Sequence, residues 1–253
     1  MKFKVKRMEN KNFERPALKE AICEIRFNQL SDEDTQKIPG RLVAMLSENY
    51  PLFNVVDESP FKFSFGGNVI GQIVHRYAFS SQDHNYLITI KPDSFGFVFK
   101  PDEGRNYDWD TYYKSACLEW ERVSQILSIS EATRVGMRYV NLLSLDPDSK
   151  NNDYFANSSY IPHSPLEGNS NFLNRNEYSL DENNKFIITS GAQFLPEMNK
   201  KELVLDIDRI TENMVLKKSE IAHHLVLLHN DIEKVFFDSI TDKYKQHMKP
   251  IGQ

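Results

Sequence analysis

The chain has 253 residues, of which 40% are hydrophobic and 12% aromatic, and its formal net charge is −5. This composition supplies enough apolar side chains for a packed core and excludes global disorder. A protein that coats duplex nucleic acid needs a basic surplus to displace counterions, so the acidic balance argues against a duplex nucleic-acid partner. No apolar run approaches the roughly 20 residues that cross a bilayer, and no secretory h-region follows the basic start. We therefore expect a cytoplasmic protein without a membrane partner.

The first half of the chain predicts a strand, a helix, a meander and a second helix. Residues 1–16 are polar and end at Arg15-Pro16, which indicates an N-terminal arm. Alternation over 21–27 predicts a strand, and a helix with Pro39 in its first turn follows the capping segment 31–34. The meander strands are expected at 61–65, 73–79, 86–90 and 95–99. Apolar spacing from Trp109 to Leu127 predicts the second helix.

The second half repeats this order in outline. A strand is expected at 133–145, followed by a long loop over 146–171 that is rich in Asn, Asp, Ser and Pro. Three strands near 172–180, 185–195 and 202–211 precede a final helix over 217–244.

Together these elements predict an α+β fold of antiparallel meander sheets packed by helices. The arm is followed by a single domain over 17–253. Because each half has a lead strand, a connector, a meander and a closing helix, we consider an internal duplication with pseudo-repeats 17–130 and 131–247.

Cysteines and histidines do not indicate a metal site. Cys23 and Cys117 lack CxxC spacing, and a disulfide framework needs more cysteines, so two buried free thiols are expected. His223, His224 and His229 are separated by one, five and six residues, which does not place them on one helix face. We interpret them as surface or helix-flank residues and expect no cofactor.

Two arginines and two aspartates are the charged residues that could form a site. Arg134 and Arg138 lie on one face of a predicted strand with Gly136 between them, and Asp206 and Asp208 share one face of another. An arginine–aspartate ladder between neighbouring strands would satisfy all four charges. Alternatively the arginines could bind a phosphate or carboxylate, and the aspartates a divalent ion. Solvent exposure of the aspartates is the third alternative.

The long loop carries three aromatic residues, Tyr154, Phe155 and Tyr160, among polar groups. Exposed aromatics in a loop suit contact with a protein partner. The alternative is a variable connector with a few tucked aromatic side chains.

Four segments together resemble a sporadically distributed, functionally uncharacterised prokaryotic family of about 260-residue proteins. They are PALKEA (16–21) running into EIRF (24–27), RVGMRYVN (134–141), LVLDID (203–208) and LHNDIEKVFF (228–237) followed by Ile240-Thr241. The resemblance spans nearly the whole chain, and its second segment matches well at Arg134, Gly136, Arg138, Tyr139 and Asn141. It transfers no catalytic residues. Its patchy distribution implies an accessory gene, as in defence systems or toxin–antitoxin pairs.

Three functions remain open at this point. No P-loop, dinucleotide fingerprint or GxSxG elbow occurs, which favours a non-enzymatic binding or adaptor protein of a bacterial accessory or defence operon. Its partner would be another protein or a second copy of the chain. The second hypothesis is a metal-dependent enzyme acting on nucleic acid or nucleotide phosphate through Arg134, Arg138, Asp206 and Asp208. The third is a sensor that binds a small ligand in the concave face of the sheet.

Overall fold

The structure is a computed structural model that describes residues 13–14, 16–58, 63–65, 68–70, 74–101, 107–156 and 171–249. Most of the predicted N-terminal arm and Tyr160 lie outside these residues. The elements are β1 (Leu18–Arg26), α1 (Asp32–Leu46), β2 (Leu52–Glu58), β3 (Phe63–Phe65), β4 (Asn68–Ile70), β5 (Val74–Ser80), β6 (Tyr86–Lys91), β7 (Ser94–Phe99), α2 (Trp109–Ile126), β8 (Glu131–Leu145), η1 (Asn151–Asp153), β9 (Phe172–Ser179), β10 (Asn184–Leu195), η3 (Pro196–Met198), β11 (Lys200–Lys217), η4 (Lys218–Glu220), α3 (Ile221–Ser239) and α4 (Asp242–His247).

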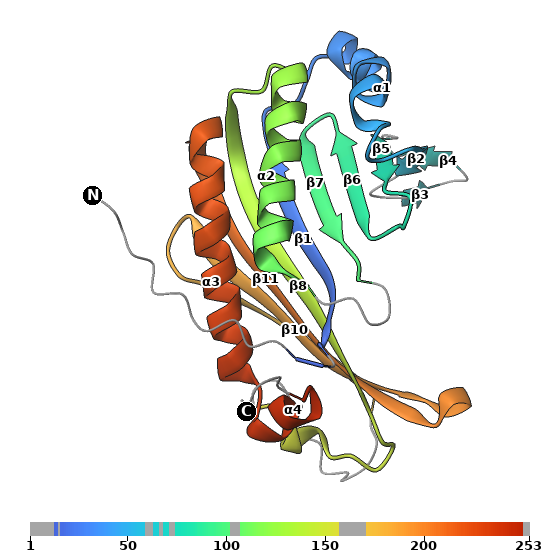
Figure 1. The fold of residues 1–253 in the computed structure, drawn as a ribbon, viewed down its shortest axis with the longest axis vertical. Helices are drawn as coiled ribbons and strands as arrows, with labels where there is room; N and C mark the ends of the chain where they lie inside the picture. Colours follow the sequence, from blue (N-terminus) through green and yellow to red (C-terminus); the bar gives the residue numbers. More distant parts are fainter. Residues whose placement is uncertain are drawn as a thin grey trace.

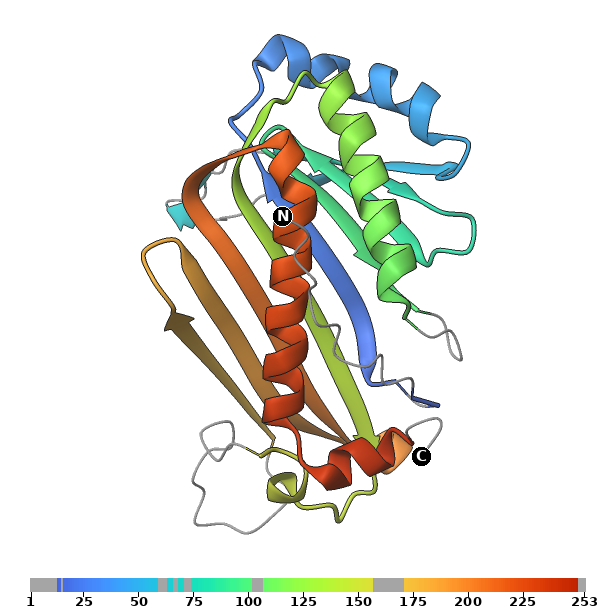
Figure 2. The ribbon, with the colours of Figure 1, turned by 60° about the vertical axis from the view of Figure 1, so that its left-hand side comes forward.

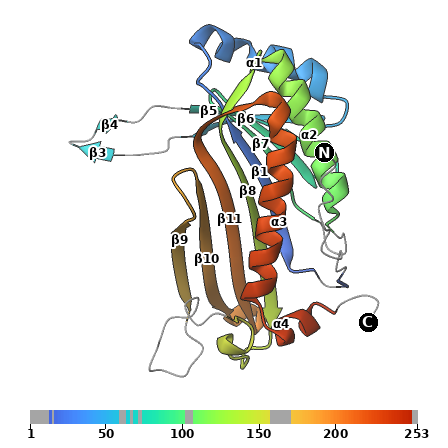
Figure 3. The ribbon, with the colours of Figure 1, turned by 90° about the vertical axis from the view of Figure 1, so that its left-hand side faces the viewer.

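Nine of the strands form one antiparallel sheet, so the predicted α+β class with an antiparallel meander is confirmed (Figure 1). The strand order is β2-β5-β6-β7-β1-β8-β11-β10-β9, and β3 and β4 pair separately, apart from this sheet (Figure 3). The sheet holds its register because one face is apolar: β1, for example, buries Ala21, Cys23 and Ile25, while Glu24 between them faces the other way.

Helices α2 and α3 lie along one face of the sheet, α2 beside β7 and α3 beside β8 and β11 (Figure 2). The apolar face of α2 buries Tyr112, Ala116, Trp120 and Val123, which matches the predicted stripe. One cluster of buried side chains joins these helices to the sheet from Phe13 to Met248. The face opposite the helices is polar along its centre and carries the predicted arginines and aspartates.

The two halves of the chain occupy the sheet symmetrically. The lead strands β1 and β8 pair at its centre, and each is flanked by the strand that precedes a long helix, β7 before α2 and β11 before α3. The meander of each half then continues outward to its own edge of the sheet. This arrangement fits the hypothesis of an internal duplication, which stays a hypothesis.

Four local predictions differ from the structure. The strand expected at 61–65 is not part of the meander, because β3 pairs with β4 in a separate two-stranded sheet. Strand β2 was not predicted, because Leu52–Glu58 lacks strict alternation of apolar and polar residues. Helix α1 begins at Asp32 after the Ser31 cap, so Pro39 lies inside the helix and not in its first turn. The predicted final helix is two helices, because Ile240 is extended and the Thr241 side chain caps α4 by accepting a hydrogen bond from the Tyr244 N–H at 3.2 Å.

The start of the long loop is packed against this break. Tyr154 and Phe155 are buried, with 5% and 3% of their surface exposed, and Phe155 forms a bridge with Ile240. The interpretation of these two aromatics as exposed partner contacts is therefore wrong in this conformation, and the alternative of tucked side chains describes them. Tyr154 packs edge-on against Tyr244, and both tyrosines and Phe155 belong to the buried core cluster.

A close approach between β6 and β7 explains the glycine at position 96. Gly96 lies directly opposite Thr89, and a Cβ atom at this glycine would lie 2.3 Å from Oγ1 of Thr89. We expect Gly96→Ala to lower the free energy of unfolding by about 1–3 kcal/mol, the usual cost of overpacking. Thr89→Ala in the same chain should restore most of it, because the next nearest atom is 3.7 Å away. Urea denaturation of both single variants and the double variant measures the coupling. Strictly additive effects would contradict this explanation.

Candidate functional site

The predicted arginine–aspartate ladder is present in one of its two pairs. Arg138 on β8 donates two hydrogen bonds to Asp206 on β11, from Nε to Oδ1 at 2.8 Å and from Nη2 to Oδ2 at 2.7 Å. In the β8–β11 register Arg138 lies directly opposite Asp208. Asp206 is two residues from Asp208 on the same face of β11, so its side chain is within reach of Arg138. The parallel arrangement of both bonds is the strongest geometry for such a pair.

Among the described residues, Arg134 forms ion pairs with glutamates and not with an aspartate. Its guanidinium contacts Glu24 on β1 and lies 3.7 Å from Glu212 on β11. Glu212 in turn binds Lys185 on β10 at 2.6 Å, and Lys185 lies 3.2 Å from Glu177 on β9. Charges of alternating sign therefore cross five adjacent strands, and this chain of ion pairs supports the order of the strands.

Burial acts to raise the pKa of Glu24, but the charge of Arg134 and the hydrogen bonds from Arg26 and Arg134 outweigh it, and the net shift is downward. Arg134 also covers the glycine between the two arginines, since a Cβ atom at Gly136 would lie 3.7 Å from its Nη2. The two arginines that could have bound a phosphate over this glycine are thus paired with carboxylates of the chain itself.

Of the four charged residues predicted to form the ladder, Asp208 is the one that no ion pair of the described residues includes. No hydrogen bond from the described part of the chain reaches it, and burial raises its pKa from 3.8 to about 6 although Arg134 and Arg138 act to lower it. Among the described residues no group of three or more His, Cys, Asp or Glu has the arrangement of a metal site. Asp206 and Asp208 are placed side by side, but Asp206 is already bound by Arg138.

A notch in the sheet lies where β1 begins and β8 continues past it. β1 pairs with β8 only as far as Leu18, and the last backbone contact is the Leu142 N–H donating to the Ala17 carbonyl at 2.7 Å. Pro16 has no N–H to continue the ladder. Donors alternate between the two sides of a strand, so the Ser144 N–H points into the notch, and no backbone group of the described residues accepts from it.

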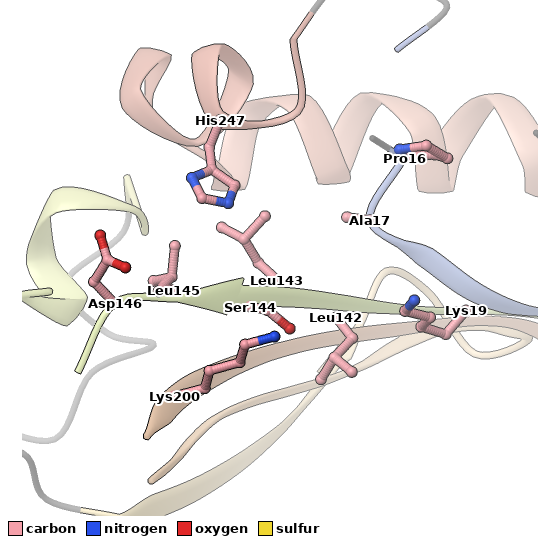
Figure 4. Close-up of a pocket in the computed structure, with 10 residues that line it drawn as sticks. All are labelled: Pro16, Ala17, Lys19, Leu142, Leu143, Ser144, Leu145, Asp146, Lys200 and His247. Carbon is pink, nitrogen blue, oxygen red and sulfur yellow. The ribbon is translucent and has the colours of Figure 1, made fainter. Parts of the chain in front are cut away.

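A cavity of about 380 Å³ occupies this notch (Figure 4). Leu143 and His247 lie on one side of the β8 ribbon and Lys200 on the other. Its lining is completed by the start of β1 and the end of β8, through Pro16, Ala17, Lys19, Leu142, Ser144, Leu145 and Asp146. Within the described residues this strand edge is unpaired. Leu143, Leu145, Asp146 and His247 line it on one side of the ribbon, and Leu142 and Lys200 on the other.

A second cavity, of about 150 Å³, lies among the start of α2, the middle of α3 and β8. His229 is buried there, 9% exposed, and stacks on Trp109 with 3.8 Å between ring centres. The interpretation of His229 as a surface residue is therefore wrong. Sequence reasoning missed this cluster because it joins α3 to Tyr139, 90 residues earlier in the chain, and to the start of α2, which is more distant still. The helical spacing of His229 and Glu233 was visible.

Comparisons with known proteins do not identify the chain. No model of a protein family matches the sequence, and no curated protein matches it either. The resemblance to the prokaryotic family of about 260 residues therefore stays a prediction. Within the described residues, no helix has the length and apolar character needed to cross a membrane.

Proposed function

We propose that this chain is a non-enzymatic binding protein that captures an extended segment of a partner protein at the open edge of β8. The observation that carries the proposal is the notch beside Ser144, where an unused backbone donor adjoins a cavity of about 380 Å³. A partner segment that adds a strand there gains main-chain hydrogen bonds for affinity and side-chain pockets for specificity. The family resemblance supports an accessory or defence operon as the setting.

The two walls of the notch favour a particular partner segment. Successive side chains of an added strand would point alternately to the two faces of the sheet. On one face they would meet Leu143 and Leu145, and on the other Lys200. An extended segment that alternates apolar and acidic residues is complementary to both walls.

The enzyme hypothesis has less support from the contacts. It requires Asp206 and Asp208 to hold a divalent ion together, and Asp206 accepts both of its hydrogen bonds from Arg138. The arginines of this hypothesis also have partners within the chain, because Arg138 binds Asp206 and Arg134 contacts Glu24. Removing an ion pair of this kind to free a metal ligand has an energetic cost that a ready-made site avoids.

Ser144→Pro is expected to abolish capture of the partner. The proline removes the donor that faces the notch, while the β8–β11 ladder keeps its bonds because Leu143 and Leu145 donate to the other side. The measurement is a nuclease-treated affinity pull-down from the cells in which the chain occurs, followed by mass determination of the intact complex.

Ser144→Ala is the matched control, since it retains the backbone donor and should capture the partner as the unaltered chain does. Equal amounts of a stoichiometric partner on the proline and alanine variants would refute the edge as the binding site. A chain that is recovered alone, without a protein partner, would refute the proposed function itself.

A further inference from the structure

The smaller cavity has features that the proposed function does not use. Its aromatic lining comes from Tyr107 and Trp109 before and in α2, and from Phe236 and Phe237 on α3. Phe237 is held in place by stacking on Phe13, with 6.3 Å between ring centres. A benzene-sized molecule fits a cavity of this volume, since an engineered apolar cavity of about 150 Å³ binds benzene.

A chain of hydrogen bonds lies at the inner end of the cavity. The hydroxyl of Tyr107 lies 2.7 Å from that of Tyr139, which lies 2.8 Å from Nδ1 of His229. Asn141 beside them donates to the Leu205 carbonyl at 3.1 Å. Tyr139, Asn141 and His229 are buried and Tyr107 is half-buried, and each has a hydrogen-bond partner, so they fix the shape of the cavity.

Glu233 also lines the cavity, but it takes no part in these hydrogen bonds. It follows His229 by one helical turn on α3, and no hydrogen bond or ion pair from the described residues reaches its carboxylate. The other carboxylate of the lining, Asp108, already accepts a hydrogen bond from the Thr111 N–H at 2.9 Å as the cap of α2. Burial raises the pKa of Glu233, as expected for a carboxyl group without a cation.

The charges of the lining are one-sided. It contains two carboxylates and no Lys or Arg among the residues that the structure describes. A phosphate or carboxylate ligand would meet uncompensated negative charge there, whereas a cation would gain both a carboxylate partner and the faces of aromatic rings.

From the cavity, its aromatic walls and the unpaired carboxylate of Glu233, we infer that this site binds a small organic cation with a primary ammonium group on a compact apolar body. The ammonium binds the Glu233 carboxylate, and the apolar body lies among Trp109, Phe236 and Phe237. The site is separate from the β8 edge and does not depend on the proposed function.

Isothermal titration calorimetry of the full chain at pH 7.5 with three probes of similar size tests this site. The probes are benzylamine, benzyl alcohol and benzoate, which carry a positive, zero and negative charge. We expect benzylamine to bind about tenfold or more tightly than benzyl alcohol, the usual effect of a charge-assisted contact, and benzoate not to bind. Equal binding of benzylamine and benzyl alcohol, tighter binding of benzoate, or no heat with any probe would overturn the inference.

Glu233→Gln should remove the preference for benzylamine and leave the binding of benzyl alcohol unchanged. The matched control is Asp238→Asn, which alters a carboxylate of the same helix that is 64% exposed and bound to Lys234. An unaltered preference in Glu233→Gln would overturn the role of this carboxylate. The three-probe comparison on the unaltered chain decides the inference even where a variant fails to fold.

Discussion

Asp206→Asn and Asp208→Asn are expected to change the free energy of unfolding in opposite directions at pH 7. Asp206→Asn removes the charge that holds two hydrogen bonds from Arg138, at 2.8 and 2.7 Å. Because the Arg138 side chain is 47% exposed, water replaces part of the lost interaction. We expect a loss of about 1–2 kcal/mol, below the cost of breaking a fully buried pair.

Asp208→Asn is expected to stabilise the fold at the same pH. Burial raises the pKa of Asp208 from 3.8 to about 6, so the folded state binds this proton more tightly than the unfolded state. The stability that the protonated Asp208 side chain contributes is fully present below pH 3.8. It is lost as the pH rises through about 6, where the buried carboxyl group ionises. Two pK units correspond to roughly 3 kcal/mol, and partial exposure reduces the expected gain of the variant to about 2 kcal/mol.

Urea denaturation at pH 7 and pH 4 measures both effects. The gain from Asp208→Asn should vanish at pH 4, where the native side chain is protonated and uncharged. Each variant serves as the control for the other, because Asp206 and Asp208 are two residues apart on the same face of β11. Destabilisation by both variants at pH 7 would show that Asp208 is bound like Asp206 and would contradict the pKa shift.

His229→Gln is expected to remove an acid-dependent loss of stability. Burial lowers the pKa of His229 from 6.5 to about 4, although Asp110 acts to raise it. A depressed histidine pKa contributes stability that is present above pH 6.5 and is lost as the pH falls towards 4. The loss is about 3 kcal/mol over this range, and glutamine keeps a hydrogen-bonding group beside Tyr139 but does not titrate.

The contribution of His229 is measured as the difference between variant and unaltered chain, because Asp208 has the opposite pH dependence in an overlapping range. The free energy of unfolding is determined for both chains at pH 7 and pH 4.5. The unaltered chain should lose more stability than His229→Gln between these two values. Equal losses would contradict a buried, neutral histidine stacked on Trp109.

The sequence was sufficient to predict most of the sheet. Alternating apolar residues located β1 and β8, because each buries one face against α2 and α3 and exposes charges on the other. Where the chain lacks this alternation, as in β2, or where a helix ends without Gly or Pro, as at Ile240, periodicity had no means of locating the boundary.

Contacts across the sheet were predicted only in part. Strand faces placed Arg138 and Asp206 correctly, because same-face side chains of adjacent strands must meet. The partner of Arg134 depended on which strand lies on the other side of β8, and that is a property of the sheet order. The notch at Ser144 and the cavity at His229 depend on where separate segments end and cross, which no local pattern encodes.

The most direct test of a partner strand at β8 is the hydrogen-exchange rate of the Ser144 amide in the free chain and in the complex recovered from the pull-down. In the free chain this amide should exchange rapidly, while that of Leu143, whose residue pairs with Leu203 in β11, exchanges slowly. The proposal predicts that Ser144 becomes protected in the complex and Leu143 stays protected. A Ser144 amide that exchanges as rapidly in a stoichiometric complex as in the free chain would contradict it.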